Sequence, residues 1–247
     1  MSAASDKYEE DVAKAIDLNE SVSAERPKVS VKFADIRINE YKGRKIPASA
    51  PVWVEVKMNH TDNLGNTRVA WDGKKWTASM KPGKREPIKE FAIDYLSRSP
   101  EIKRFLKDIE KFSGIENPKL PTTLGGLKET GAVPLDVMRN YFKTKANQYI
   151  LNIQNVDLGK LVTDHYIFGK EEPAYYLQAA DDFYMIGDKN PLRLPAAIPK
   201  LKGRGDFKMR IGLRTQYYEI QPEIKITNME YSSYSVKPGT RKKNPFG

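Results

Sequence analysis

Cysteine is absent from this chain of 247 residues, and histidine occurs only twice, as His60 and His165. The absence of cysteine excludes disulfide bonds, thiolate metal sites and cysteine nucleophiles. Two histidines are too few for a histidine-rich zinc site. No apolar run has the length of a membrane-spanning helix, and the first residues lack the hydrophobic core of a signal peptide. These absences predict a cytoplasmic protein, either bacterial or, if phage-encoded, in the cytoplasm of the host.

Positive charge is the clearest surplus in the composition. The chain has 42 Lys and Arg against 32 Asp and Glu, a formal net charge of +10. Its 39% hydrophobic and 10% aromatic content predicts a folded globular protein. A basic surplus favours a polyanionic partner, of which nucleic acid is the commonest, although solubility or an acidic protein partner would explain it as well. Charge therefore predicts a class of partner and leaves the chemistry open.

Residues 51–58 have the alternation of a β-strand, with one uniformly apolar face. The other face carries Glu55 and Lys57 side by side. Opposite charges on a half-buried strand are costly to desolvate unless they have a partner or a task, and a metal ion would provide both. Taken alone, a Glu-x-Lys tripeptide usually lies on a solvated face or forms a weak surface ion pair. The apolar face consists of Val52, Val54, Val56 and Met58.

Residues 5–18 are predicted to form a helix that Ser5 caps. Glu9 adjoins the apolar stripe of this helix, whereas Glu10 and Asp11 point further into solvent. Acids near a helix N-terminus commonly complement the helix dipole, so position alone does not give Glu9 a further role. The stripe consists of Tyr8, Val12, Ala15 and Ile16.

Asp35 stands between two predicted strands. Residues 29–33 alternate apolar and polar side chains, and the alternation continues beyond a bend near Asp35 through Ile36 and Ile38. Aspartate is disfavoured inside strands, so Asp35 is either a turn residue or a residue with a function.

This order of an acid on a first helix, an aspartate at a strand, and then Glu55 and Lys57 on a second strand resembles the PD-(D/E)xK nuclease superfamily of type II restriction endonucleases. The resemblance covers roughly residues 5–60. It implies that Asp35 and Glu55 ligate Mg²⁺, that Lys57 positions or activates the attacking water, and that Glu9 or Glu10 completes the site. Ala34 stands where the family usually has proline.

The chemistry of Mg²⁺ agrees with this set of residues. Mg²⁺ prefers hard oxygen ligands and keeps several waters, so two carboxylates and a backbone carbonyl, for which Val56 is well placed, would suffice. The ion would polarise the scissile phosphate, and Lys57 would stabilise the developing charge. Such a cleavage needs neither cysteine nor histidine as a catalytic group. His60 lies in the polar loop that follows the strand and is interpreted either as a phosphate contact or as a structural residue.

A hairpin is predicted from residues 67–71 and 74–78 around Asp72-Gly73. Its tryptophans, Trp71 and Trp76, are interleaved with basic residues, which suits phosphate contact with base stacking; a solubilised hairpin with core tryptophans explains the pattern equally well. The candidate DNA contacts here are Lys74, Lys75, Lys84 and Arg85.

A second basic stretch lies at residues 201–214, where a strand is predicted from residue 206. Lys208, Arg210 and Arg214 are separated by even numbers of residues, so on a strand they would lie on one face, which we expect to face DNA. Arg204 and Arg210 are candidates for base-edge contact, with contact to phosphate alone as the alternative. Lys202 belongs to the same set of candidate DNA-binding residues.

The remaining pattern predicts further elements. Residues 113–133, rich in Pro, Gly and Thr, are interpreted as a linker or a substrate-contacting loop. Residues 237–243 are expected to form a mobile basic arm. Helices are predicted at 86–97, 100–112 and 134–149, and a hairpin at 174–179 and 182–187.

Together these observations predict an α/β fold of the restriction-endonuclease-like type, with a mixed central sheet flanked by helices and a β-rich C-terminal half. One nuclease domain would comprise a catalytic core at 1–112 and a DNA-recognition half at 113–247. The expected function is Mg²⁺-dependent cleavage of double-stranded DNA, as a sequence-specific restriction endonuclease and possible homodimer. The alternatives are a phage-type resolvase or DNA-processing nuclease, a non-catalytic DNA-binding protein, and a structural virion protein.

Overall fold

A computed structural model describes residues 3–27, 34–65, 67–143 and 149–247. The chain is mixed α/β, as predicted. It divides into two compact units: residues 1–64, 157–204 and 226–247 form the first, and residues 65–156 and 205–225 the second. The units therefore do not divide at 112/113, and the first collects segments from both ends and the middle of the chain. In the described ranges, no helix combines the length and apolar character needed to cross a membrane.

The first unit contains a mixed sheet in which β4 is the central strand of the order β1-β2-β4-β8-β9. Strands β1, β2 and β4 are antiparallel, β4 and β8 are parallel, and β8 and β9 form the predicted hairpin. β3 pairs with the last two residues of β2, Glu40 and Tyr41. The predicted strand at 29–33 lies outside the described residues. The strands are β1 (Val22–Glu25), β2 (Ile36–Tyr41), β3 (Arg44–Lys45), β4 (Val52–Lys57), β8 (Ala174–Ala179) and β9 (Asp182–Met185).

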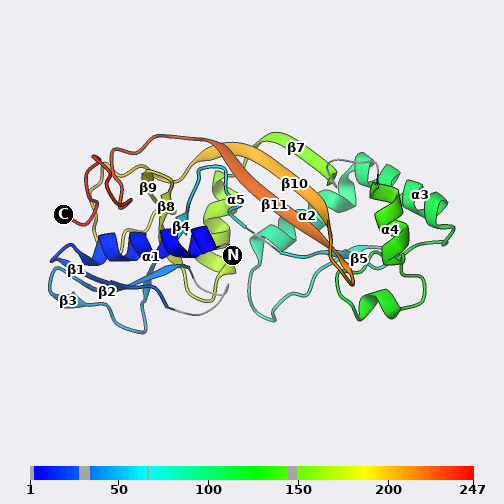
Figure 1. The fold of residues 1–247 in the computed structure, drawn as a ribbon, viewed down its shortest axis with the longest axis horizontal. Helices are drawn as coiled ribbons and strands as arrows, with labels where there is room; N and C mark the ends of the chain where they lie inside the picture. Colours follow the sequence, from blue (N-terminus) through cyan, green and yellow to red (C-terminus); the bar gives the residue numbers. More distant parts are fainter. Residues whose placement is uncertain (1–2, 28–33, 66, 144–148) are drawn as a thin grey trace. The chain divides into compact units, whose positions relative to one another are not determined.

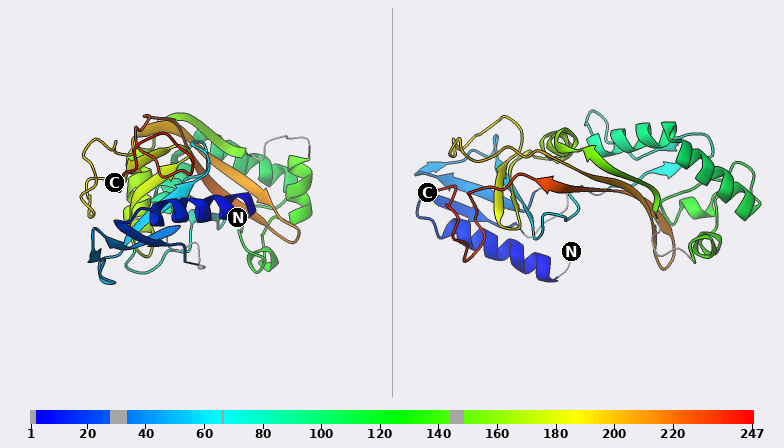
Figure 2. Two further views of the ribbon diagram at one scale, coloured as in Figure 1. Left: turned by 60° about the vertical axis from the view of Figure 1, so that its left-hand side comes forward. Right: turned by 90° about the horizontal axis from the view of Figure 1, so that it is seen from above.

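β4 is buried on both faces, as a central strand must be. Its apolar face packs against α1 (Ala3–Asp17), whose Val12, Ala13 and Ile16 join the same core. Figures 1 and 2 show α1 lying along one face of these strands. On the opposite face, Glu55 accepts a hydrogen bond from Tyr166, which belongs to the π-helical turn η2 (His165–Gly169) that continues α5 (Gly159–Asp164). The predicted strand and helix are confirmed, and the two charged residues of β4 lie beneath a cover that the sequence did not predict.

The second unit combines helices with a three-stranded sheet in the order β11-β10-β7. The helices at 86–97 and 100–112 are confirmed; Ser99 accepts a bond from the Ile102 N–H, and Gly114 ends the second helix at φ 68°. The predicted hairpin is present, although its paired strands are short. The elements are β5 (Ala70–Trp71), β6 (Trp76–Thr77), α2 (Pro87–Arg98), α3 (Pro100–Ser113), η1 (Gly126–Lys128), α4 (Leu135–Phe142), β7 (Tyr149–Asp157), β10 (Gly203–Leu213) and β11 (Tyr218–Met229).

Three predictions need correction. The helix predicted at 134–149 ends at Phe142, and Tyr149 begins a strand. The segment 113–133 is not a linker: Leu120 and Val133 are buried, and the Leu120 backbone pairs with Trp71. The arm predicted at 237–243 is anchored by Lys242, whose Nζ binds Asp182 at 2.7 Å, and just beyond it the buried Phe246 packs against Tyr41 and Phe183. Apolar residues at these positions find partners far away in the sequence, which local patterns do not show.

Candidate active site

Asp35 and Glu55 lie at the same end of the sheet because of the register between β2 and β4. Ile36 faces Val54 and Arg37 faces Trp53 in the antiparallel ladder. Extending this register by one residue places Asp35, at the bend before β2, opposite Glu55. Residues opposite one another on antiparallel strands have neighbouring side chains on one face. The bend predicted at Asp35 is therefore confirmed, and the two acids are brought together.

The backbone of Val56 belongs to the same site. Its N–H donates a hydrogen bond of 2.7 Å to Asp35 Oδ2. Because the N–H and C=O of one strand residue point to the same side of the strand, the Val56 carbonyl also points toward Asp35. The ladder with β2 ends at Val54, so this carbonyl lies just beyond it. The carbonyl predicted as a third oxygen ligand therefore lies on the side of β4 that faces Asp35.

Glu55 is buried, and its two carboxylate oxygens have different surroundings. Oε1 accepts hydrogen bonds from Lys57 Nζ at 2.5 Å and from the Tyr166 hydroxyl at 3.2 Å. Oε2 accepts none and has Lys170 Nζ at 3.7 Å. Burial alone would raise the pKa of Glu55, but the two ammonium groups lower it to about 2. Glu55 is therefore a carboxylate with one oxygen still open to a further contact.

Asp35 titrates differently from its neighbour. Burial raises the pKa of Asp35 to about 7, and the charges of Glu55 and Glu9 add to this effect. Lys57 and the Val56 N–H act in the opposite direction without offsetting it. Two acids at adjacent positions cannot both carry a charge at low cost unless a cation joins them.

Lys57 remains an ammonium group in this environment. Burial alone would lower its pKa, but attraction by Glu55, followed by smaller contributions from Tyr166 and Asp35, raises the pKa well above its ordinary value. Its side chain is 20% exposed. Lys57 can therefore stabilise negative charge, whereas acting as a base would require it to lose a strongly held proton.

Glu9 is buried on α1, as its place beside the apolar stripe predicted, but its carboxylate is already engaged. Arg26 donates two bonds to Glu9 Oε2, at 2.9 and 2.6 Å. Ser5 lies inside the helix and donates to Glu9 Oε1 at 3.3 Å, so it does not cap the helix as predicted. Glu10 is exposed. Among the described side chains, no three of the types His, Asp and Glu converge as a metal-binding group.

Tyr166 and Lys170 are site residues that the sequence reasoning missed. Both come from the π-helical turn and its end, more than a hundred residues after Glu55. Such turns are rare and often lie at functional sites, but they have no simple sequence signature. Burial raises the pKa of Tyr166 well above its ordinary value, so its hydroxyl remains a hydrogen-bond donor to Glu55.

The residues present fit a Mg²⁺ ion held by two carboxylates and one carbonyl. Asp35, Glu55 and the Val56 carbonyl are hard oxygen donors on one edge of the sheet, and Glu55 Oε2 is buried without a hydrogen bond. Glu9 would act on such an ion from outside, through Asp35. The two ammonium groups beside Glu55, those of Lys57 and Lys170, oppose the binding of a cation.

His60 has a structural partner. Its Nε2 lies 2.7 Å from Asp182 Oδ2, and Asp182 is a buried residue of β9. Asp182 also accepts bonds from Lys242 Nζ at 2.7 Å and from the Ser232 N–H at 2.6 Å. These three contacts satisfy the buried carboxylate, and they favour the structural interpretation of His60 over a phosphate contact.

The basic residues predicted on β10 are paired with acids of β11. Arg210 binds Glu223 at 2.7 Å and Gln221 at 3.0 Å, and Arg214, just beyond the strand, binds Glu219 at 3.1 Å. Lys208 lies 3.5 Å from Asp206. Lys208 and Arg210 lie on the same face of β10, as predicted. The acids of β11, however, offset much of the positive charge along this face.

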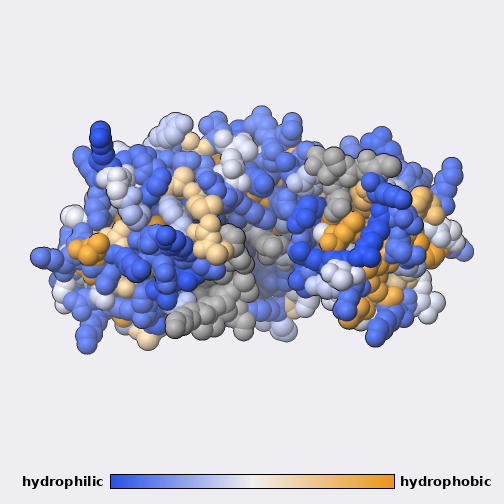
Figure 3. Space-filling view, in the orientation of Figure 1, coloured by the Kyte–Doolittle hydropathy of each residue, from blue (hydrophilic) through white to orange (hydrophobic). Residues whose placement is uncertain are grey.

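The other candidate DNA contacts are exposed, as a surface role requires. They are Lys74, Lys75, Lys84, Arg85, Lys202 and Arg204. The visible face of the molecule is mainly hydrophilic (Figure 3), in keeping with a chain that is 30% charged.

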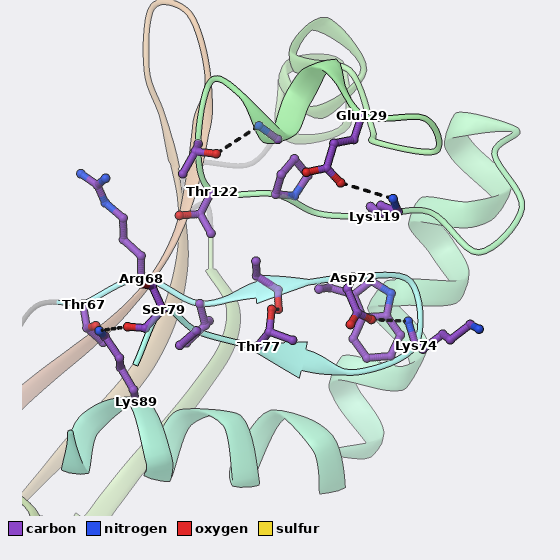
Figure 4. Close-up of a pocket in the computed structure, with 17 residues that line it drawn as sticks. Thr67, Arg68, Asp72, Lys74, Thr77, Ser79, Lys89, Lys119, Thr122 and Glu129 are labelled. Carbon is purple, nitrogen blue, oxygen red and sulfur yellow. Dashed lines mark hydrogen bonds and ion pairs between the residues drawn. The ribbon is translucent and has the colours of Figure 1, made fainter. Parts of the chain in front are cut away.

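A hollow of about 760 Å³ lies beside the hairpin in the second unit (Figure 4). Its wall includes Trp71 and Lys74 of the hairpin and lysines from two other segments. Lys119 is paired with Glu129 at 3.3 Å, and Lys89 donates to the Ser79 carbonyl at 2.6 Å. Trp76 is buried and its ring lies 5.5 Å from that of Trp71. Of the two tryptophans, only the half-buried Trp71 therefore has a surface that a ligand could reach.

Comparisons with protein-family models, with curated proteins and with solved structures found no match to this chain.

Proposed function

We propose that this protein is a Mg²⁺-dependent endonuclease that cleaves phosphodiester bonds in double-stranded DNA, with its active site at Asp35, Glu55 and Lys57. The observation that carries the proposal is the hydrogen bond from the Val56 N–H to Asp35, where the ladder of β2 and β4 ends, with Lys57 bonded to the neighbouring Glu55. The net charge of +10 supports a polyanionic substrate. The proposal takes up the resemblance to the PD-(D/E)xK nucleases and extends it to a sequence-specific enzyme.

Each residue has a role that its surroundings support. Asp35, Glu55 and the Val56 carbonyl would hold the ion, which when bound polarises the scissile phosphate and makes the attacking water more acidic. Lys57 stays cationic and stabilises negative charge that develops on the phosphate. Tyr166 donates to Glu55 and orients its carboxylate. Glu9, itself held by Arg26, adds negative charge near Asp35 and so favours a cation there.

The experiment is cleavage of supercoiled plasmid with Mg²⁺ and with EDTA, using wild type, Asp35→Asn and Lys57→Met. Wild type should nick or linearise the plasmid only with Mg²⁺, and both variants should lose this activity while keeping their affinity for DNA. Equal cleavage by wild type and both variants would refute the site. DNA binding without any metal-dependent cleavage would instead indicate a non-catalytic DNA-binding protein.

Mapping the ends on a linear DNA of known sequence separates the specific forms of the proposal. Discrete fragments with constant ends are expected of a restriction endonuclease. Cleavage confined to branched DNA would indicate the resolvase alternative. Sedimentation of the protein with and without DNA tests the proposed homodimer, since a dimer would cut both strands in one encounter.

A further inference from the structure

Lys170 is a largely buried lysine whose ammonium group makes no close contact with its carboxylate partner. Its side chain is 14% exposed, and Nζ lies 3.7 Å from Glu55 Oε2, beyond hydrogen-bond distance. The ammonium also lies 5.5 Å from the centre of the Tyr166 ring. A buried charge of this kind is retained only where other charges balance it. The contact is therefore electrostatic and includes no hydrogen bond between Lys170 and Glu55.

The two oxygens of Glu55 show what Lys170 balances. Oε1 is occupied by the short bond from Lys57 and by the bond from Tyr166. Oε2 is buried and accepts no hydrogen bond. A buried carboxylate oxygen without a donor requires an explanation, because such groups are normally satisfied. Lys170 supplies the charge that this oxygen needs without supplying the bond.

We propose that Lys170 is an exchangeable counter-ion, which balances Glu55 Oε2 in the metal-free protein and releases it when a divalent cation binds. The inference rests on the proposed function. The four-carbon chain of lysine allows the ammonium to swing away from the incoming cation while it stays close to the site. With a substrate bound, the negative charge of its phosphate would replace that of Glu55 as the partner of the ammonium. Lys57, bonded at 2.5 Å, stays in place.

This exchange has a consequence for metal affinity. A positive charge a few ångströms from a divalent cation opposes the binding of that cation. In a partly buried site, this repulsion lowers the metal affinity by more than about tenfold. Removing the charge of Lys170 should therefore tighten metal binding by at least about tenfold. A lysine whose ammonium group lay far from the bound cation would have no such effect, and its loss would leave the metal affinity unchanged.

The test measures Mn²⁺ binding to the full-length protein without DNA, from the paramagnetic resonance signal of free Mn²⁺. Lys170→Met removes the charge and leaves no polar end group, Lys170→Gln removes the charge but keeps a polar end group, and Lys170→Arg keeps the charge. Lys160→Met is the matched control, because Lys160 lies on α5 and is 85% exposed. Both neutral variants should bind Mn²⁺ at least about tenfold more tightly than wild type, whereas Lys170→Arg and Lys160→Met should bind like wild type.

Plasmid cleavage at saturating Mg²⁺ completes the test. The neutral variants should cleave more slowly than wild type although they bind metal more tightly, and Lys170→Arg should retain activity. Unchanged or weaker Mn²⁺ affinity in a neutral variant that melts cooperatively would overturn the inference. If wild type cleaves with Mg²⁺ and Asp35→Asn does not, the proposed function stands whichever way Lys170 behaves. If wild type neither binds Mn²⁺ nor cleaves, the proposed function itself fails.

Discussion

The charged residues around β4 and those along β10 differ in what the fold does with them. Around β4, Glu55 is buried with two ammonium groups beside it and one oxygen that accepts no hydrogen bond. Along β10, the guanidinium groups of Arg210 and Arg214 are more exposed, and Glu223 and the buried Glu219 of β11 bind them; Glu219 also has Arg68 at 2.8 Å. Glu55 Oε2 therefore has an ammonium group only at 3.7 Å, whereas the acids of β11 each have a guanidinium group within about 3 Å, which leaves less of that positive charge for a ligand.

The largest expected effect comes from the acids of β4 and the bend before β2. Asp35→Asn should lower the rate of Mg²⁺-dependent cleavage by about a thousandfold or more, because an oxygen ligand of the ion contributes several kcal/mol to the transition state. The amide keeps an oxygen that can accept the Val56 N–H, so the fold should survive. Single-turnover cleavage of a labelled duplex measures the rate. A decrease below tenfold in a folded variant would contradict the assignment.

A smaller effect is expected from Glu9. Its carboxylate reaches the site only through Asp35, so Glu9→Gln should slow cleavage by about tenfold, in the range of an outer partner of a metal ligand. Glu10→Gln is the matched control, since Glu10 is exposed on the same helix and should have no effect. The same single-turnover assay compares the two. Equal rates for both variants would remove Glu9 from the site.

The exposed lysines of the hairpin should affect binding rather than cleavage. Replacing Lys74 and Lys75 together with Gln should weaken duplex affinity several-fold and reduce the slope of affinity against salt by about one for each lost phosphate contact. Lys14→Gln, an exposed change on α1, should leave both unchanged. Fluorescence anisotropy at several salt concentrations gives affinity and slope. An unchanged slope in the double variant would exclude these lysines from the interface.

The smallest effect on DNA binding is expected when Arg210 of β10 loses the acid that pairs with it. Glu223→Gln releases the Arg210 guanidinium from its carboxylate, so duplex affinity should rise about two- to threefold. Glu230→Gln makes the same change of net charge at an exposed position. A rise in Glu223→Gln that exceeds the rise in Glu230→Gln, in the same anisotropy assay, would identify Arg210 as a masked contact. Equal increases in duplex affinity for both variants would show that affinity depends only on net charge and not on Arg210.

The parts of the fold that could be predicted are those written in local patterns. A few neighbouring residues are enough to show the alternation in β4, the apolar stripe of α1, and the unusual position of Asp35 between two strand patterns. The approach of Tyr166 to Glu55 joins residues 111 apart and depends on the parallel pairing of β4 with β8, so no local pattern contains it. For the same reason, the alternation of basic residues along β10 could be predicted from the sequence, whereas their pairing with acids of β11 could not.

The corrected elements have the same physical origin. Tyr149 was assigned to the end of a helix because its neighbours are compatible with both states, and the sheet partner that makes it a strand lies more than fifty residues later. Phe246 follows a run of basic residues that suggested a mobile arm, but its ring is fully buried against Tyr41 and Phe183. Tertiary contacts at these positions override local preference.

The most direct measurement is the anomalous scattering of Mn²⁺ in a crystal of the protein soaked with that ion. A single peak within coordination distance of an Asp35 carboxylate oxygen, Glu55 Oε2 and the Val56 carbonyl, with Lys170 Nζ displaced from Glu55, is the predicted result. Density at another position, or none at a Mn²⁺ concentration that supports plasmid cleavage, would contradict the account.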